Sequence, residues 1–379
     1  MSEWKKVKLG EVCEISAGGD RPQIFSNHRT DKCRIPIYSN GIDNEGLYGF
    51  TDTPKNNGNA ITITGRGANA GTVFYRKDPF LSIIRLLTLT PNSEIINAKY
   101  LFYLLKNKTF LSTGSAQPQI TVPNISQFEI EFNPDIETQH RIASILSRYD
   151  SLIENYQKQI KLLEEAARRL YKEWFIDLRF PGHENTKIVD GVPEGWERKS
   201  IGDIGEYLNG FAFKPSDWQD LGKPIIKIKE MGNGVTNETP RNSGERVPAK
   251  YLIKAGDLLF SWSATLMVII WSGEEGWLNQ HLFKVTPAKG INREFLLQSI
   301  SNTIVEFQNL TTGSTMKHIQ RNKLDQVFVN VPNAEIMKRY TDISEKTRSN
   351  ILSLQSQLRL LTEARDRLLP KLMSGEITV

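Results

Sequence analysis

The sequence of 379 residues is poor in cysteine and contains no long apolar run. Its two cysteines, Cys13 and Cys33, lack the spacing of a metal or redox site, and so low a count is usual in a reducing compartment. Without about eighteen consecutive apolar residues there is no candidate membrane span, and the amino-terminal stretch WKKVKLGEV lacks the apolar centre of a signal peptide. We therefore expect a cytoplasmic protein without a membrane partner.

Sequence motifs for catalysis are missing as well. There is no Gly-x-x-x-x-Gly-Lys-Ser/Thr loop, no His-Glu-x-x-His motif and no Asn-Pro-Pro-Phe/Tyr signature of an adenine methyltransferase. The five histidines are scattered without ligand spacing, which predicts that the chain has no metal site. The stretch GRGANA at 65–70 fits a dinucleotide motif, but a strand pattern follows where that motif requires a helix. These absences favour a chain that binds and positions other molecules and has no catalytic residue.

What the sequence does contain is an internal repeat. LLEEAARRL at 162–170 returns as LLTEARDRL at 360–368, with six of nine positions identical. Three more pairs follow one another in the same order in both halves: WKKVKLGEV with WERKSIGDI, STGSAQPQI with TTGSTMKHI, and FEIEF with VFVNV. A repeat of about two hundred residues is too long for a solenoid, which stacks short units. It predicts two similar halves related by a pseudo-two-fold axis.

The repeat sets the expected domain boundaries. We predict a globular domain at 1–134, a helical segment at 135–181, a second globular domain at 182–332 and a second helical segment at 333–379. Both globular parts mix short strand patterns, such as RIPIYS and DLLFSWS, with one helical pattern each, NAKYLFYLLKN and NREFLLQSISNTIVEF. The stretch PIIKIKEM alternates apolar and basic residues and predicts another strand. The fold class is therefore α+β.

Each helical segment carries one apolar seam. From Ile142 to Trp174 an apolar or small residue recurs in alternating steps of four and three, and adding 198 gives a second seam from Tyr340 to Leu372. Because the seams share one register, we expect the helices to form an antiparallel coiled coil that holds the two globular domains apart. Packing on the globular domains and homodimerisation are the alternatives. The coiled-coil positions are expected at Leu146, Ile153, Tyr156, Ile160, Leu163, Leu170, Ile351, Leu354, Leu358, Leu361 and Leu368.

The ends of these helices have recognisable signals. Asp135 and Asn333 stand at matching places before the two seams and are good N-cap residues. Pro370 lies near the end of the second seam, and we expect it to end or kink that helix.

The loops between the predicted strands combine glycine with hydrogen-bonding side chains. Arginine, asparagine and glutamine suit base edges in DNA, although surface loops are polar in any protein. Lys227 and Lys229 are expected to share one face of a strand. The candidate DNA-binding residues are Arg21, Gln23, Ser39, Asn40, Arg66, Asn69, Ser115, Gln117, Gln119, Lys214, Lys227, Lys229, Ser261, Trp262, Ser263, Ser314, Lys317 and His318.

Three stretches resemble a known family. YKEWFIDLRFPGHE at 171–184, GVPEGW at 191–196 and LLPKLMSGEI at 368–377 are similar to the specificity subunit of type I restriction-modification enzymes, as are the two TGS loops. The resemblance covers the whole order of parts. It implies two target recognition domains that read a bipartite asymmetric sequence in double-stranded DNA. It also implies that the spacer helices dock two methyltransferase subunits, and that restriction subunits join the complex.

The resemblance also places the cofactors. S-adenosylmethionine, ATP and Mg²⁺ are expected on the partner subunits, and none on this chain. One departure is that the second helix begins with AEIM where the first has the IETQ that is typical of the family. Two other functions stay open on the residues alone: a coiled-coil adaptor whose globular domains bind protein or glycan, and an enzyme with an unrecognised site. The sequence does not identify the bases that would be read.

Overall fold

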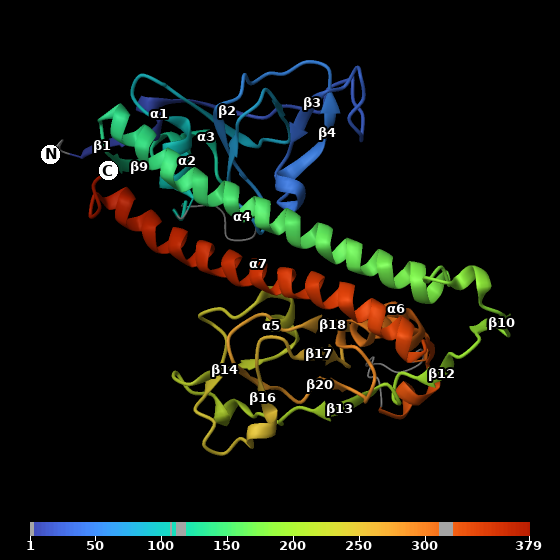
Figure 1. Cartoon of the computed structure of the whole chain (residues 1–379). Helices are drawn as coiled ribbons and strands as arrows, with labels where there is room; N and C mark the ends of the chain where they lie inside the picture. Colours follow the sequence, from blue (N-terminus) through green and yellow to red (C-terminus); the bar gives the residue numbers. More distant parts are fainter. Residues whose placement is uncertain (1–3, 107, 111–118, 311–320) are drawn as a thin grey trace. The chain divides into compact units, whose positions relative to one another are not determined.

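The computed structural model describes residues 4–106, 108–110, 119–310 and 321–379. The chain forms two compact units, one of residues 1–152 with 361–379 and the other of residues 153–360. Each unit combines a β-rich part with portions of both long helices (Figure 1). None of the described helices is long and apolar enough to cross a membrane.

Unit 1 contains three sheets. The central sheet is antiparallel, with strand order β2-β8-β5-β6, and beside it lie a sheet of order β4-β3-β7 and the pair β1-β9. Its strands are β1 (Lys5–Lys8), β2 (Cys13–Ala17), β3 (Ile35–Tyr38), β4 (Leu47–Thr51), β5 (Ala60–Ile63), β6 (Val73–Arg76), β7 (Leu81–Ser82), β8 (Leu87–Pro91) and β9 (Glu129–Phe132). Its short helices are α1 (Leu9–Val12), α2 (Ala98–Leu105) and α3 (Val122–Ser126).

Unit 2 repeats this topology. The order β13-β20-β17-β18 corresponds to β2-β8-β5-β6, and β15-β14-β19-β16 contains the counterpart of β4-β3-β7. Its strands are β10 (Ile188–Val189), β11 (Val192–Pro193), β12 (Glu197–Ser200), β13 (Gly205–Asn209), β14 (Lys223–Ile226), β15 (Arg241–Asn242), β16 (Leu252–Ile253), β17 (Leu258–Ser261), β18 (Met267–Ile270), β19 (Gly276–Leu278), β20 (Leu282–Pro287) and β21 (Phe328–Val331). Its helices are α5 (Ile228–Asn233) and α6 (Arg293–Leu310). The predicted internal repeat is therefore confirmed.

Most predicted strands and helices are present, and one is wrong. PIIKIKEM is a strand only through Ile226, and Ile228–Asn233 form helix α5. Lys227 is the N-cap residue of α5, and its main-chain N–H donates to the Glu230 carboxylate at 3.1 Å. Lys227 and Lys229 therefore do not share a strand face.

The long helices α4 (Ile136–Tyr171) and α7 (Ala334–Ser374) begin at the predicted caps. The Asp135 carboxylate accepts the main-chain N–H of Thr138 at 3.0 Å, and the Asn333 side chain accepts that of Ile336 at the same distance. A π-helical turn (Lys172–Ile176) follows α4. Pro370 does not end α7, which continues to Ser374.

The two long helices pack antiparallel (Figure 1). In unit 1, Asp150 of α4 forms an ion pair with Arg365 near the end of α7. In unit 2, the Phe175 ring, just after α4, packs 4.9 Å from the Tyr340 ring near the start of α7. Every position of both predicted seams is buried or half-buried, whereas most other positions of these helices are exposed.

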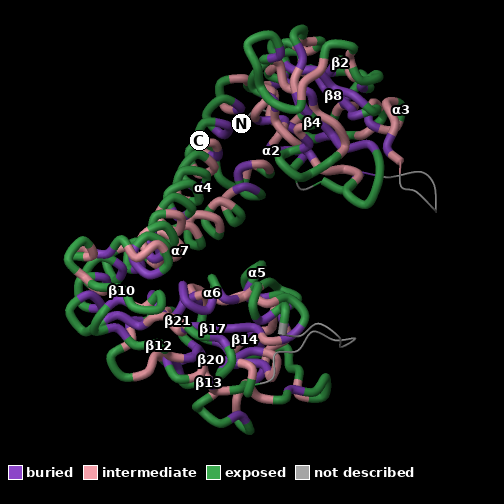
Figure 2. Tube along the Cα trace, turned by 90° about the vertical axis from the view of Figure 1, so that its right-hand side faces the viewer, coloured by how far each residue is buried: buried purple, intermediate pink, exposed green. Residues whose placement is uncertain are grey.

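Each unit has an aromatic and aliphatic core to which the long helices contribute. In unit 1, Ile142 and Leu146 of α4 and Leu372 of α7 join the core beneath the central sheet. In unit 2, Trp174 and Tyr340 join the core beneath its counterpart. Figure 2 shows that buried residues follow the strands within each unit, whereas the loops are largely exposed.

Candidate nucleic-acid interface

The predicted loops of unit 1 meet at one end of the central sheet. Asn40, after β3, ties two of them together: its side-chain carbonyl accepts the Gly65 N–H at 2.7 Å, and its NH₂ group donates to the Ile84 carbonyl at 2.5 Å. Because both ends of this amide bond to the main chain, Asn40 positions the loops of unit 1.

The β5–β6 loop is held from its other side as well. The Ile120 N–H donates to the Gly65 carbonyl at 2.9 Å, and Arg66 forms an isolated antiparallel bridge with Gln119. As predicted, strand β6 follows GRGANA, so this loop is the turn of a hairpin and not a dinucleotide site. The bridge places the exposed Arg66 beside the half-buried Gln119, two predicted DNA-binding residues from distant parts of the sequence.

The turn between β7 and β8 lies at the centre of these loops. The N–H groups of Ile84 and Arg85 donate to the carbonyls of Gly19 and Gly18 at 2.8 and 2.9 Å. Gly18 in turn donates to the Leu86 carbonyl at 2.9 Å. A Cβ atom added at Gly18 would lie 2.6 Å from the Ile83 nitrogen, so this close approach requires glycine.

This turn was missed by sequence reasoning. Ile84 and Arg85 both have positive φ, 52° and 57°, and both side chains are exposed between buried Ile83 and Leu86. The run SIIRLLTLT has the composition of a strand and contains no glycine or asparagine to signal the turn. Left-handed isoleucine is uncommon because its branched side chain crowds the backbone.

A buried arginine supports the strand that leads into the Ser39–Asn40 loop of unit 1. The Arg76 guanidinium lies 3.6 Å over the Tyr38 ring and donates to the Glu45 carboxylate at 3.0 Å. Burial lowers the pKa of Arg76, whereas Tyr38 and Glu45 favour its charged form. The network borders a cavity of about 430 Å³ and fixes Tyr38, which precedes the Ser39–Asn40 loop.

The remaining predicted residues of unit 1 are distributed around these loops. Arg21, Gln23 and Asn69 are exposed, and Ser39 is half-buried. The Arg21 guanidinium lies 5.0 Å over the Phe25 ring, which orients it. Ser115 and Gln117 lie outside the described residues.

Unit 2 holds the matching turn with two of the same main-chain bonds. Gly210 donates to the Leu282 carbonyl at 3.0 Å, as Gly18 does to Leu86. Leu282 donates to the Asn279 carbonyl at 3.0 Å, the counterpart of the 3.1 Å bond from Leu86 to Ile83. A Cβ at Gly210 would lie 2.1 Å from the Asn279 carbonyl oxygen. Both units therefore need glycine at this place.

The side chains on the matching turn are different. Gln280 and His281 take the places of Ile84 and Arg85, and both are half-buried. The Gln280 amide lies 3.3 Å from the His281 ring nitrogen, and the Trp262 ring packs 5.6 Å from the His281 ring. Trp262, a predicted residue in the β17–β18 loop, also donates to the Asn209 side chain at 3.1 Å.

Two predicted serines of unit 2 are buried. The Ser261 hydroxyl donates to the Thr265 carbonyl at 2.6 Å and accepts the Met267 N–H at 2.9 Å, so it shapes the β17–β18 hairpin. Ser261 is 0% exposed and Ser263 is 5% exposed. Neither side chain is available to a base edge in this structure, and both are withdrawn as DNA-binding candidates.

The predicted lysines of unit 2 lie on separate elements. Lys214 is exposed, and Lys229 forms a 3.3 Å ion pair with Glu238. The Lys227 ammonium lies 4.4 Å over the Trp218 ring. Ser314, Lys317 and His318 lie outside the described residues.

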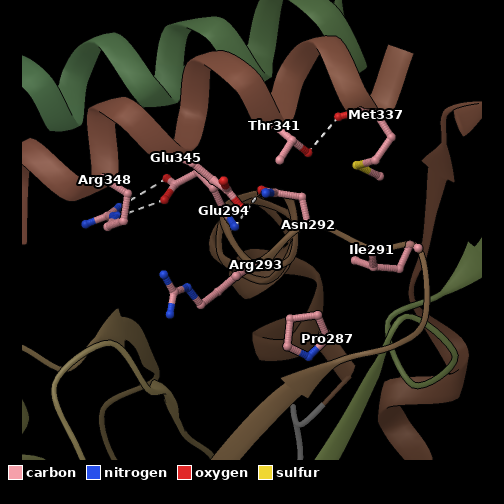
Figure 3. A pocket seen from close by; sticks show the side chains of 10 residues that line it. Pro287, Ile291, Asn292, Arg293, Glu294, Met337, Thr341, Glu345 and Arg348 are labelled. Carbon is pink, nitrogen blue, oxygen red and sulfur yellow. Dashed lines mark hydrogen bonds and ion pairs between the residues drawn. The ribbon is translucent and has the colours of Figure 1, made fainter. Parts of the chain in front are cut away.

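A buried polar junction of unit 2 lies elsewhere, where α6 begins beside α7 (Figure 3). Arg348 of α7 donates two hydrogen bonds to the Glu294 carboxylate, at 2.8 and 3.1 Å, and both side chains are buried. Asn292 caps α6 by accepting the N–H groups of Glu294 and Phe295. A cavity of about 450 Å³ adjoins this junction and has no predicted DNA-binding residue in its lining. Across the described ranges, no group of three or more His, Cys, Asp and Glu residues could hold a metal ion.

Comparisons with known proteins identify the family of the chain. Residues 1–165 and 193–358 match the family model described as the type I restriction modification DNA specificity domain. The chain is 27% identical over 344 residues to the type I restriction enzyme MjaIX specificity subunit of Methanocaldococcus jannaschii, covering 84% of this chain and 78% of the relative. It is 26% identical to the HindI specificity subunit of Haemophilus influenzae over the full length of both chains.

A solved structure has the same fold. The S subunit of a type I restriction-modification system from M. genitalium superimposes with a TM-score of 0.67, covering 98% of this chain and 96% of that one. The two sequences are 16% identical, so this match bears on the fold alone.

Proposed function

The chain belongs to the type I restriction-modification DNA specificity family, as a non-catalytic specificity subunit, and from this we propose that its two units read two unlike halves of a split DNA target. The observation that supports this proposal is that the two units share one main-chain scaffold but carry different side chains on it. Gly18 and Gly210 donate equivalent bonds to Leu86 and Leu282. The turn of one unit exposes Ile84 and Arg85, whereas that of the other carries the half-buried Gln280 and His281. Equal scaffolds with unlike loops favour a bipartite, asymmetric target.

The chemistry of the loops fits double-stranded DNA. The side chains of Arg21, Arg66 and Asn69 are exposed and can donate hydrogen bonds to base edges or to phosphates. Arginine and asparagine commonly make contacts of both kinds in protein–DNA complexes. We assign recognition of the two half-sites to the globular domains 1–134 and 182–332. We assign the spacer between them to the helical segments 135–181 and 333–379.

The remaining subunits of the complex follow from the family. We propose that the helical segments dock two methyltransferase subunits and that restriction subunits join them. S-adenosylmethionine, ATP and Mg²⁺ then belong to those partners, which supply the transferred methyl group and the cleavage chemistry. The charged groups on the outer faces of α4 and α7, which flank the apolar seams, are the available contacts for such partners.

The test is to co-express the chain with its methyltransferase subunit and to map the methylated positions genome-wide. The expected result is one motif with two unlike defined parts and an undefined gap. Exchanging residues 1–134 for the same segment of a relative should change one part only. A continuous or palindromic motif, or a change in both parts, would contradict the proposal.

A further inference from the structure

The turn at Ile84 and Arg85 combines three features that seldom occur together. Its backbone is left-handed at two successive non-glycine residues, one of them branched at Cβ. Its Ile84 side chain is 49% exposed, whereas the flanking Ile83 and Leu86 are 0% exposed. Strained conformations of this kind persist only where the surrounding structure determines them, and they gather at functional sites.

The surrounding structure does determine this turn. The N–H groups of residues 83–86 all donate to main-chain carbonyls, and the Ile84 carbonyl accepts from the Asn40 amide. This network uses no atom of the Ile84 side chain. The isoleucine is therefore held outward, although replacing it with asparagine would ease the strain at its positive φ.

The position of the turn suggests what the side chain meets. The turn lies against Gly18 and Gly19 on one side and against Gly65 on the other. The exposed arginines Arg21 and Arg66 follow these glycines within two residues in the sequence. Basic side chains around an exposed aliphatic group suit a duplex, with phosphates outside and base edges within. In the major groove, the C5-methyl group of thymine is the apolar feature that base edges present.

We propose that Ile84 reads a thymine in the half-site of unit 1 by contact with its C5-methyl group, while Arg85 beside it contacts the DNA backbone. The inference rests on the proposed function, because it names one base contact within the half-site assigned to residues 1–134. Unit 2 carries hydrogen-bonding Gln280 and His281 at the matching turn, so its half-site is read there through polar base edges.

The experiment uses the complex of the full chain with its methyltransferase subunit and a duplex that carries the mapped target. Ile84→Asn removes the apolar contact and places in the turn a residue that tolerates positive φ, so folding is preserved. Ile95→Asn is the matched control, because Ile95 is also an exposed isoleucine of unit 1 but follows the far end of β8. Each thymine of the first half-site is replaced in turn by uracil, which lacks only the methyl group.

For the unsubstituted complex, uracil at one thymine should weaken binding about four- to tenfold, the loss expected for one apolar group withdrawn from contact. Ile84→Asn should weaken binding to the normal duplex by a similar factor, leave random DNA binding unchanged and abolish the effect of that uracil. Ile95→Asn should behave as the unsubstituted chain does.

Four results would overturn the assignment. They are a first half-site without any A·T pair, full binding by Ile84→Asn, equal losses on target and random DNA, and a weakened variant with no uracil effect in the unsubstituted complex. Failure of the proposed function is distinguishable from these, because the unsubstituted complex would then methylate no split target.

Discussion

The Arg365 guanidinium of α7 donates to the Asp150 carboxylate of α4 at 2.9 Å, and the side chains are 17% and 20% exposed. Under the 198-residue repeat, the counterpart of Asp150 is Arg348 and that of Arg365 is Ala167. The ion pair is therefore made once, and its counterpart in unit 2 is replaced by the buried bond between Arg348 and Glu294. The two helices therefore carry opposite charges at one pair of equivalent positions, Asp150 and Arg348, although their apolar seams are alike.

This relationship can be measured by a double-mutant cycle. Asp150→Asn and Arg365→Gln should each lower the free energy of unfolding, with a coupling of about 0.5–2 kcal/mol, because the pair is neither fully exposed nor fully buried. Urea unfolding of the full chain gives the four values. A coupling of zero would show that the ion pair does not help to join the helices in unit 1.

Gly18→Ala should destabilise unit 1 by about 1–3 kcal/mol, since the added methyl group would overlap the main chain at Ser82 and Ile83. It should also relax recognition of the first half-site, because it displaces the turn that carries Ile84. Gly19→Ala is the control: a Cβ there has only the Lys55 ammonium within 4 Å, at 3.9 Å, and the backbone is not left-handed. Thermal unfolding and methylation mapping check both variants, and equal behaviour of the two would refute the close approach.

Glu164→Gln should make the protein more stable near neutral pH. Burial raises the pKa of Glu164 on α4, an effect that Arg348 and Arg168 oppose and Glu294 reinforces. A raised pKa means that the folded state favours the protonated form. The protonated Glu164 side chain therefore contributes to the stability of the fold. This contribution is complete below the usual pKa of 4.5 and is lost as the pH rises through the raised pKa.

Glu164→Gln should therefore increase the free energy of unfolding at pH 7 by less than about 1 kcal/mol. This increase should vanish below the usual pKa of glutamate. Urea unfolding between pH 4 and pH 7.5 measures it, with Glu154→Gln at an exposed site of the same helix as control. A loss of stability at pH 7 would mean that the attraction to Arg348 and Arg168 outweighs burial.

Arg66→Ala should weaken binding to the target more than binding to random DNA if the guanidinium contacts a base, with a discrimination loss of about 1–3 kcal/mol. Lys77→Ala is a useful comparison, because Lys77 is an exposed cation at the opposite end of the β5–β6 hairpin. Titrations at two salt concentrations separate the effects. A uniform loss on all sequences, with a reduced salt slope, would assign Arg66 to phosphate.

Periodicity was sufficient to predict most of the fold. The seams of α4 and α7 are long enough that a period of 3.5 is unambiguous, and Asp135 and Asn333 carry side chains that satisfy free N–H groups at a helix start. PIIKIKEM failed because alternation over few residues also fits a strand that turns into a short helix. Glu230, three residues after Lys227, was the available signal for a cap.

The site was predicted less completely, because side-chain chemistry does not reveal where a side chain points. Asn40 and Ser261 have groups that suit base edges, but the protein uses them to join its own loops. Ile84 escaped notice for the opposite reason. The pattern of an isoleucine among apolar neighbours predicts a strand. The bonds that Ile84 and Arg85 donate to the carbonyls of Gly19 and Gly18, which are distant in sequence, hold the turn that exposes Ile84.

The main-chain network around the two turns separates folding from recognition. Since Gly18 and Gly210 donate the equivalent bond in both units, and the side chains of Ile84 and Arg85 take no part in the main-chain network, these side chains carry little of the scaffold's stability. Such side chains can change without loss of the framework, so a new target can arise from one or two substitutions without an intermediate that fails to fold. Selection can then act on which DNA is methylated while the framework stays unchanged.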